Sequence, residues 1–263
     1  MIIGFEQKIQ EYTPDIFGEA LLSGPVPLLY HDVLVLYSKV PLWTRHYEFF
    51  ALAAEYLQVD LPYYFLHYDE FLSRLVNRAK FYKALVRVVF YAYEKSIRFV
   101  AIPAKIDYEE FLAVKDLVVF NLRDKHIITS PFDVKSYGPA SIYINSVKAK
   151  RVFVDANGNV LQVADKAIII RKGKKIISPD HTAGASYNVL QQEVLFELDS
   201  MGYEVERAAL FSSDFDKADE VWLVDDGRGI YYRVGVEDNR YLYTDLAKDI
   251  IAGLNGVLLN TIE

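Results

Sequence analysis

One stretch of this chain has the pattern of a ligand-binding loop: KADEVWLVDDGRGIYYRVGVEDNR, residues 217–240. It predicts an acidic turn, a buried strand, an acidic and glycine-rich loop and a second strand, and loops at the ends of buried strands often hold ligands. A phosphate would need neutral hydrogen-bond donors there, but the loop carries Asp225 and Asp226. A carboxylate about 4 Å from a phosphate dianion costs on the order of 4 kcal/mol per charge pair near a protein surface. The loop is therefore unsuited to phosphate unless both carboxylates point away.

The other residue types that could do chemistry do not form a recognisable set. The chain has no cysteine, which excludes disulfides, thiolate catalysis and cysteine-ligated metals. It has no glycine-rich phosphate loop and no Gly-x-Ser-x-Gly motif. No two histidines pair at metal-ligand spacing on one helix face or hairpin, so a metal site is not expected. The histidines are His31, His46, His67, His126 and His181.

The elements that must position the acidic loop are predicted around it in the second half of the chain. Asn157-Gly158 is a suitable hairpin turn because both residues tolerate positive φ. Gly202 can take the left-handed conformation that closes a helix. In order, the predicted elements are a short helix over 141–150, a three-strand meander over 151–179, an amphipathic helix over 187–202, a strand over 203–210 and a terminal helix over 243–258.

The first half predicts antiparallel strands with helices on one face. Residues 123–141 are polar, contain two prolines and one glycine, and break every period, which is typical of a linker and the start of a second domain. We therefore predict a first α+β domain over 1–122, a linker over 123–134 and a second α+β domain over 135–263. The elements of the first half are a strand over 31–42, helices over 44–59 and 66–81, a hairpin of 84–93 with 96–105, and a strand over 116–122.

Composition sets the class of protein. Of 263 residues, 52% are hydrophobic and 25% charged, which indicates a globular chain able to bury a core. A net charge of −7 disfavours nonspecific binding of nucleic acid. No apolar run approaches the roughly 20 residues of a membrane span, and the N-terminus lacks a signal-peptide pattern. We expect a cytoplasmic protein without a nucleic-acid or membrane partner.

Several short strings occur in an order that resembles the class IV aminotransferase family, which includes branched-chain and D-amino-acid aminotransferases and aminodeoxychorismate lyase. The second half contains DANGNVLQ, AIIIRKGKKIISP, LDSMGYEVE and ADEVWL, and the first half contains PLWTRHYEFFALAAEYLQVDLP and ALVRVVF. The resemblance covers roughly residues 30–250. It implies a two-domain α+β fold, usually a homodimer, with pyridoxal 5'-phosphate (PLP) in a cleft between the domains. The cofactor would be bound to a lysine as a Schiff base, and the substrate would be a small molecule of the amino acid or amino-chorismate type.

The resemblance also implies site residues. Lys135 stands where the family has its Schiff-base lysine, although a lysine in a linker is usually a solvated surface residue. Gln162 stands where the family has the glutamate that contacts the pyridine nitrogen. Ser186, Tyr187 and Asn188 begin a helix that would face the phosphate, with an ordinary N-cap at Ser186 or Asn188 as the alternative. Asp226 lies in the loop that binds the phosphate in the family.

Most of these positions depart from the family pattern. A glutamine at 162 cannot hold a proton on the ring nitrogen by charge, so the electron sink would be weakened. Ala167 replaces an asparagine, and Phe49 replaces the arginine that clasps the phosphate. Arg45, one helical turn earlier, is either a substitute for that arginine or an ordinary surface residue. Two hypotheses follow: a PLP-dependent aminotransferase or aminodeoxychorismate-lyase-like enzyme, or a non-catalytic relative that has lost PLP and binds another small molecule or acts as a structural or interaction protein.

Overall fold

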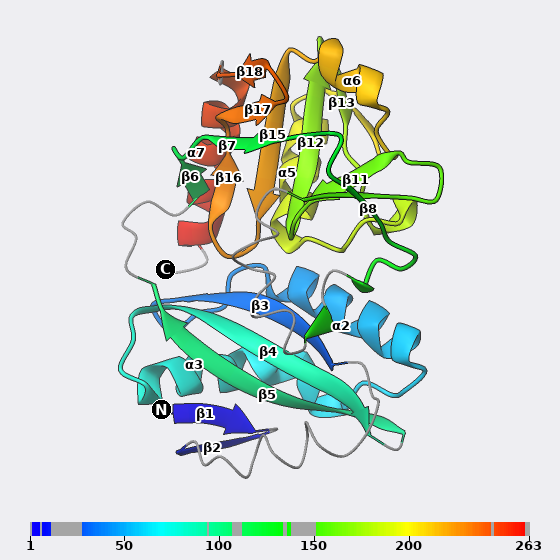
Figure 1. Cartoon of the computed structure of the whole chain (residues 1–263). Helices are drawn as coiled ribbons and strands as arrows, with labels where there is room; N and C mark the ends of the chain where they lie inside the picture. The colour runs from blue at the N-terminus through cyan, green and yellow to red at the C-terminus, as the bar shows by residue number, and fades with distance from the viewer. Residues whose placement is uncertain are drawn as a thin grey trace. The chain divides into compact units, whose positions relative to one another are not determined.

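The computed structural model describes residues 2–5, 7–11, 28–93, 95–106, 112–133, 136–137, 151–242 and 245–260. The chain divides into two units, coloured mainly blue to cyan and green to red in Figure 1. Unit 1 is built mainly from Met1–Asp107, and unit 2 from Tyr108–Lys135 together with Pro139–Asn260.

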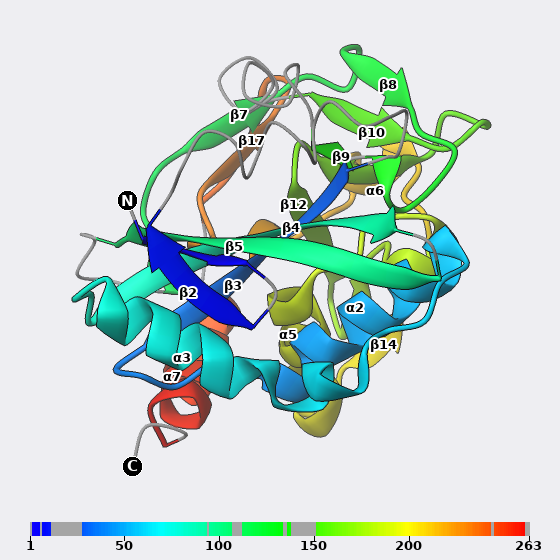
Figure 2. The same ribbon diagram turned by 90° about the horizontal axis from the view of Figure 1, so that it is seen from below.

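Unit 1 is an antiparallel sheet with helices packed on it. Its strand order is β2-β1-β5-β4-β3-β9, and β4 and β5 can be followed along their length in Figure 2. The strands are β1 (Ile2–Phe5), β2 (Lys8–Glu11), β3 (Leu28–Leu36), β4 (Lys83–Tyr93), β5 (Ser96–Lys105) and β9 (Ser136–Tyr137). The helices are α2 (Trp43–Leu57), the 3-10 helix η1 (Tyr63–His67) and α3 (Tyr68–Arg78). Both predicted helices and the hairpin are confirmed, and the strand predicted over 31–42 is present as β3 but begins at Leu28 and ends at Leu36.

Aromatic side chains join the helices to one face of this sheet. Phe90 of β4 and Phe99 of β5 are direct cross-strand partners, so their side chains share a face. Phe50 of α2 contacts Phe90 with ring centroids 5.5 Å apart, and Tyr68 of α3 contacts Phe99 at 4.8 Å. Both helices therefore cover the same face, as the sequence predicted.

Unit 2 contains a nine-stranded sheet and a smaller three-stranded one. The large sheet has the order β6-β16-β15-β12-β11-β10-β8, with β13 and β14 branching from β12, and the small sheet has the order β18-β17-β7. The strands are β6 (Leu112–Val114), β7 (Val118–Phe120), β8 (Lys125–Ile127), β10 (Val152–Val154), β11 (Val160–Val163), β12 (Lys166–Lys172), β13 (Lys175–Ile177), β14 (Glu204–Glu206), β15 (Glu220–Asp225), β16 (Gly229–Tyr231), β17 (Val234–Val236) and β18 (Asn239–Tyr241). The helices are the 3-10 helix η3 (His181–Ala183), α5 (Val189–Ser200), α6 (Ser212–Asp216) and α7 (Asp245–Asn260).

Strand pairing places the boundary between the two units closer to the N-terminus than the sequence predicted. Strands β6, β7 and β8 pair in parallel with β16, β17 and β10 of unit 2. The sequence assigned β6 and β7 to a first domain over 1–122 and β8 to a linker over 123–134. Each of these strands has only three residues, which is too short to show a period-2 pattern.

The other predictions for unit 2 can be compared with the structure one by one. The helix closed by Gly202 with its φ of 82° and the terminal helix are confirmed. The three-strand meander predicted over 151–179 contains four strands, β10 to β13, because a further turn at Ala164, with φ of 53°, separates β11 from β12. The predicted strand over 203–210 is reduced to β14, and the helix predicted over 141–150 lies outside the described residues. At the turn after β10, Gly158 has a positive φ of 81° and Asn157 does not. Asp155 shapes that turn instead, because its Oδ1 accepts the N–H groups of Asn157 and Asn159.

In the part of the chain that the structure describes, no helix is long and apolar enough to cross a membrane.

Candidate functional site

The two aspartates of the acidic loop point to different partners. The loop joins β15 to β16 in unit 2. Asp225 Oδ1 accepts the backbone N–H groups of Gly227 at 2.9 Å and Arg228 at 3.2 Å, and its Oδ2 lies 3.3 Å from Lys166 Nζ. Asp226 contacts the start of helix α5 instead: its Oδ1 accepts the N–H of Leu190 at 2.9 Å. One carboxylate therefore serves the loop itself, and the other serves a helix 36 residues earlier in the chain.

The N-terminus of α5 is supplied with acceptors from within the protein. Asn188 is the N-cap, since its Oδ1 accepts the N–H of Gln191 at 2.7 Å, and its Nδ2 donates to the carbonyl of Val224 at 3.2 Å. Asp226 adds a charged acceptor at Leu190 and is only 9% exposed. The first N–H groups of a helix lack intrahelical partners and carry a partial positive charge, so an anion is stabilised there. The N-cap interpretation of Asn188 is confirmed.

Gln162 uses both ends of its amide inside unit 2. Its Oε1 accepts the N–H of Ser186 at 2.8 Å, and its Nε2 donates to the carbonyl of Ala164 at 2.7 Å. The hydroxyl of Ser186 donates to the carbonyl of Pro131 at 2.8 Å. Gln162 and Ser186 are 2% and 5% exposed, so these bonds form where water does not compete with them.

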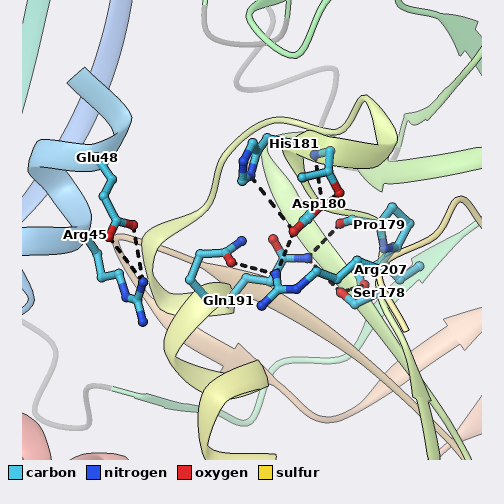
Figure 3. Close-up of polar contacts among 11 residues, drawn as sticks. Arg45, Glu48, Ser178, Pro179, Asp180, His181, Gln191 and Arg207 are labelled. Carbon is cyan, nitrogen blue, oxygen red and sulfur yellow. Dashed lines mark hydrogen bonds and ion pairs between the residues drawn. The ribbon is translucent and has the colours of Figure 1, made fainter. Parts of the chain in front are cut away.

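The other residues singled out by the sequence fall into three groups. Tyr187 is buried, with its ring centroid 5.2 Å from that of His181. In unit 1, Phe49 is fully buried and stacks on His31, and Arg45 pairs with Glu48 at 3.3 Å in a partly exposed i,i+3 ion pair (Figure 3). Phe49 is thus a core residue, and the Arg45 guanidinium has a carboxylate partner on its own helix. Lys135 lies outside the described residues, so its Schiff-base role stays a prediction.

A partly buried lysine that the sequence did not single out lies beside the acidic loop, with its side chain 12% exposed. Lys166 Nζ donates to Asp165 at 2.7 Å, faces Asp225, and lies 5.6 Å from the centroid of the Tyr231 ring. Burial disfavours its charge, but Asp165 and Asp225 outweigh burial and raise the pKa of Lys166. Burial and the charge of Asp165 raise the pKa of Asp225, against the opposing effects of Lys166 and the Gly227 N–H. An ammonium held this firmly cannot act as an amine nucleophile, which requires a depressed pKa.

A second polar network, drawn in Figure 3, joins the segment before helix α5 to Gln191 in that helix and to Arg207. The buried carboxylate of Asp180 accepts bonds from the N–H and hydroxyl of Thr182 and from Arg207, at 2.9, 2.6 and 2.6 Å. Burial acts to raise the pKa of Asp180, but these hydrogen bonds outweigh it and lower the pKa. Gln191 Nε2 donates to Ser178 Oγ and to the carbonyl of Pro179, both at 2.7 Å. This network was not predicted from the sequence; its one local signal is Asp180 two residues before Thr182, the spacing of an Asx-turn.

Two histidines that are 15 residues apart in sequence meet in the core of unit 1. His31 Nε2 and His46 Nδ1 share a hydrogen bond of 2.8 Å, and both residues are buried. Spacing along one element could not reveal the pair, because one partner lies on β3 and the other on α2. Among the described residues, no group of three or more His, Cys, Asp or Glu side chains is arranged to hold a metal ion.

Solved structures resemble this chain over its whole length. The branched-chain aminotransferase of Thermoproteus uzoniensis, solved with norvaline, superposes with a TM-score of 0.80 at 15% identity, over 100% of this chain and 96% of the other. The 4-amino-4-deoxychorismate lyase of Pseudomonas aeruginosa gives 0.72 at 13% identity, over 96% and 98%. An aminotransferase from Brucella abortus bound to PLP gives 0.76 at 14% identity, over 98% and 99%. No family model matches the sequence, and no curated protein matches it.

These likenesses establish the fold. The chain has the α+β fold of the class IV aminotransferases, as the order of its short strings predicted. The described residues do not fit the cofactor that the fold implies. The helix end suited to a phosphate already holds the carboxylate of Asp226, and the amide of Gln162 already bonds to Ser186 and Ala164.

Proposed function

We propose that this chain is a non-catalytic relative that keeps the class IV fold, does not hold PLP, and serves as a binding or structural protein. One observation carries the proposal: the polar groups of four candidate cofactor residues are already hydrogen-bonded to other groups of unit 2. They are Gln162, Ser186, Asn188 and Asp226. A buried polar group that already has good partners gains little from a ligand, because binding must first break the existing bonds.

Electrostatics supports the loss of the phosphate contact. A phosphate dianion about 4 Å from one carboxylate is repelled by on the order of 4 kcal/mol at a near-surface dielectric. The N-terminus of a helix stabilises an anion by only about 0.3–1 kcal/mol, and by up to ~2 kcal/mol in favourable partly buried geometry. Asp226 stands at that helix end, and Phe49, at the position of the family's phosphate-binding arginine, is packed in the core of unit 1. Repulsion therefore exceeds attraction.

The ring-nitrogen contact is weakened for a separate reason. PLP works as an electron sink when a carboxylate keeps its pyridine nitrogen protonated. Gln162 is neutral, and its one acceptor oxygen takes the N–H of Ser186. It lacks the charge for that role, and its oxygen already has a hydrogen-bond partner within unit 2.

A second candidate is a PLP-dependent aminotransferase or an aminodeoxychorismate-lyase-like enzyme, with Lys135 as the Schiff-base residue. It is favoured by the full-length likeness to a structure that holds PLP and by the position of Lys135 among the family-like strings. In that case the protein would be a cytoplasmic homodimer acting on a small amino donor. A sedimentation measurement of the mass in solution would test the dimer.

Absorbance separates the two candidates. The purified protein is incubated with PLP, desalted and scanned between about 330 and 430 nm, where the cofactor absorbs when held as a Schiff base. We expect the wild type to retain no absorbance in this range after desalting. Lys248→Ala, which removes an exposed lysine, is the control and should behave in the same way. Retained absorbance that disappears in Lys135→Ala and persists in Lys248→Ala would establish the PLP enzyme and refute the non-catalytic proposal.

A further inference from the structure

We propose that Asn157 is a site of spontaneous covalent modification, at which the side-chain amide is converted to aspartate or isoaspartate through a succinimide ring formed with Gly158. This Asn-Gly pair lies in the turn between β10 and β11. A second Asn-Gly pair, Asn255-Gly256, lies inside helix α7. The fold directs the reaction to the turn and protects the helix. Neither pair is among the candidate cofactor residues, so the reaction does not depend on whether the chain holds PLP.

The reaction uses water as its only co-reactant. The backbone nitrogen of Gly158 attacks the side-chain carbonyl carbon of Asn157, and a new C–N bond closes a five-membered ring. The bond from that carbon to the amide nitrogen breaks, and ammonia leaves with the proton of the Gly158 N–H. Water then hydrolyses one of the two ring carbonyls, and the choice of carbonyl decides between aspartate and isoaspartate. Glycine is the residue that obstructs this attack least, because it has no Cβ.

The side-chain amide of Asn157 is available for ring closure. Asn157 is exposed, and its side chain forms no hydrogen bond with any residue that the structure describes. Asn159 in the same turn differs, because its Nδ2 donates to Asp155 Oδ2 at 2.9 Å. A Cβ added at Gly158 would meet only Lys125 Nζ, at 3.9 Å, apart from its chain neighbours. The space around the attacking nitrogen is therefore open.

The backbone is held less firmly in the turn than in the helix. The N–H of Gly158 donates to the carbonyl of Asp155 at 3.0 Å, and the N–H of Asn157 donates to Asp155 Oδ1 at 2.8 Å. An exposed turn opens locally at a small cost in free energy, and water can then replace these bonds. Gly256 lies within α7, where each N–H bonds to the carbonyl four residues earlier and helical turns on both sides fix the backbone. Ring closure at Asn255 therefore requires local unfolding of the helix.

The experiment compares the two pairs within the same full-length chain. Wild-type protein is incubated at mildly alkaline pH, which favours loss of the attacking N–H proton, and samples are digested with trypsin. The tryptic peptides 152–166 and 249–263 contain one Asn-Gly pair each. Mass spectrometry measures the converted fraction, fragment ions locate it, and a sample taken at time zero gives the conversion during digestion. We expect Asn157 to react at least about tenfold faster than Asn255, since a helix interior opens far less often than an exposed turn.

Unfolded protein and a matched variant provide the controls. In concentrated guanidinium chloride the two rates should lie within about twofold of each other, because the helix that protects Asn255 is lost. Asn157→Gln keeps an amide in the turn but needs a larger ring to react, so conversion at position 157 should stop while Asn255 reacts as before. The proposal is overturned if Asn157 and Asn255 react equally fast in the folded protein, or if Asn157 reacts only in guanidinium chloride.

Discussion

The acidic loop shows how neighbouring residues of one type can take different roles. Asp225 binds the loop backbone and Lys166, and Asp226 binds the first turn of α5. Two like charges on adjacent residues are tolerated because each has a separate positive partner: an ammonium for the first and a helix end for the second.

Substitution of Lys166 would test how much its ion pair with Asp225 contributes to stability. Lys166→Met leaves Asp225 without this cation. Breaking a fully buried ion pair typically costs about 3–5 kcal/mol at neutral pH, and we expect a smaller loss here because the two side chains are 12% and 17% exposed. The pKa of Asp225, already raised by burial and Asp165, should rise further. A carboxyl group with a raised folded-state pKa contributes stability below its unfolded pKa and loses that contribution as pH increases. The stability deficit of Lys166→Met should therefore shrink as pH falls toward about 4, which urea denaturation at several pH values would measure.

A second lysine provides the control for that measurement. Lys248 forms an exposed i,i+3 pair with Asp245, with side chains 66% and 63% exposed, so Lys248→Met should change stability little. If Lys166→Met resembled Lys248→Met, the cluster around Lys166 would contribute nothing that solvent could not replace.

The sequence singled out several residues around the start of α5 but did not predict what they contact. Asp226, Gln162 and Asn188 were all singled out, and all three are buried and hydrogen-bonded near the start of α5. The partner of Asp226 could not be predicted, because Leu190 lies 36 residues away and contributes only its backbone N–H. The direction of a loop side chain depends on tertiary packing, which a local pattern does not encode.

At the scale of elements, one glycine allows strand β6 to join the large sheet. Gly229 begins β16 with φ of 113°, and its Cα partner on β6 is Leu112. A Cβ at this position would lie 2.3 Å from the Cα of Leu112 and 2.7 Å from its backbone C and N. Backbone atoms cannot move aside as the end of a side chain can, so only glycine permits this approach.

Gly229→Ala should therefore be strongly destabilising. Positive φ and the clash with the Leu112 backbone together should cost more than about 3 kcal/mol, measured as a shift of the urea midpoint at an unchanged slope. Gly173→Ala is the matched substitution, since Gly173 has φ of 60° and a methyl group added there would meet no atom within 4 Å. It should cost only about 1 kcal/mol for the left-handed backbone. Equal losses in the two variants would show that β6 pairing does not depend on the close approach.

Helices and strands were predicted from the sequence where a segment was long enough to show a hydrophobic period. The strand within 31–42 and the helices within 44–59 and 187–202 all appear, because their apolar spacing matches one element type. Strands β6, β7 and β8 were misplaced or missed because each has only three residues and pairs in parallel with a distant segment of unit 2. Their stability comes from these partners, and the residues themselves carry too little signal.

At the scale of the whole molecule, the fold was predictable because the order of many short strings survives when their individual residues change. Identity to the Thermoproteus and Pseudomonas enzymes is only 15% and 13%, yet nearly all of each chain is matched. A buried pattern tolerates apolar substitutions that keep volume and period. A cofactor site depends on single charges, so it can be lost while the fold remains.

Each of the two units buries hydrophobic side chains of its own, and from this we predict separate unfolding transitions. Leu72 on α3 lies in unit 1 and Leu223 on β15 lies in unit 2, and both side chains are fully buried. Either substitution to alanine should cost about 2–5 kcal/mol, from lost burial and the cavity that remains. In differential scanning calorimetry, Leu72→Ala should lower the midpoint of one transition and Leu223→Ala that of another, since domains with their own cores often unfold as distinct units. A single transition that both substitutions shift equally would mean instead that the cores unfold together, and that the stability of each unit depends on the other.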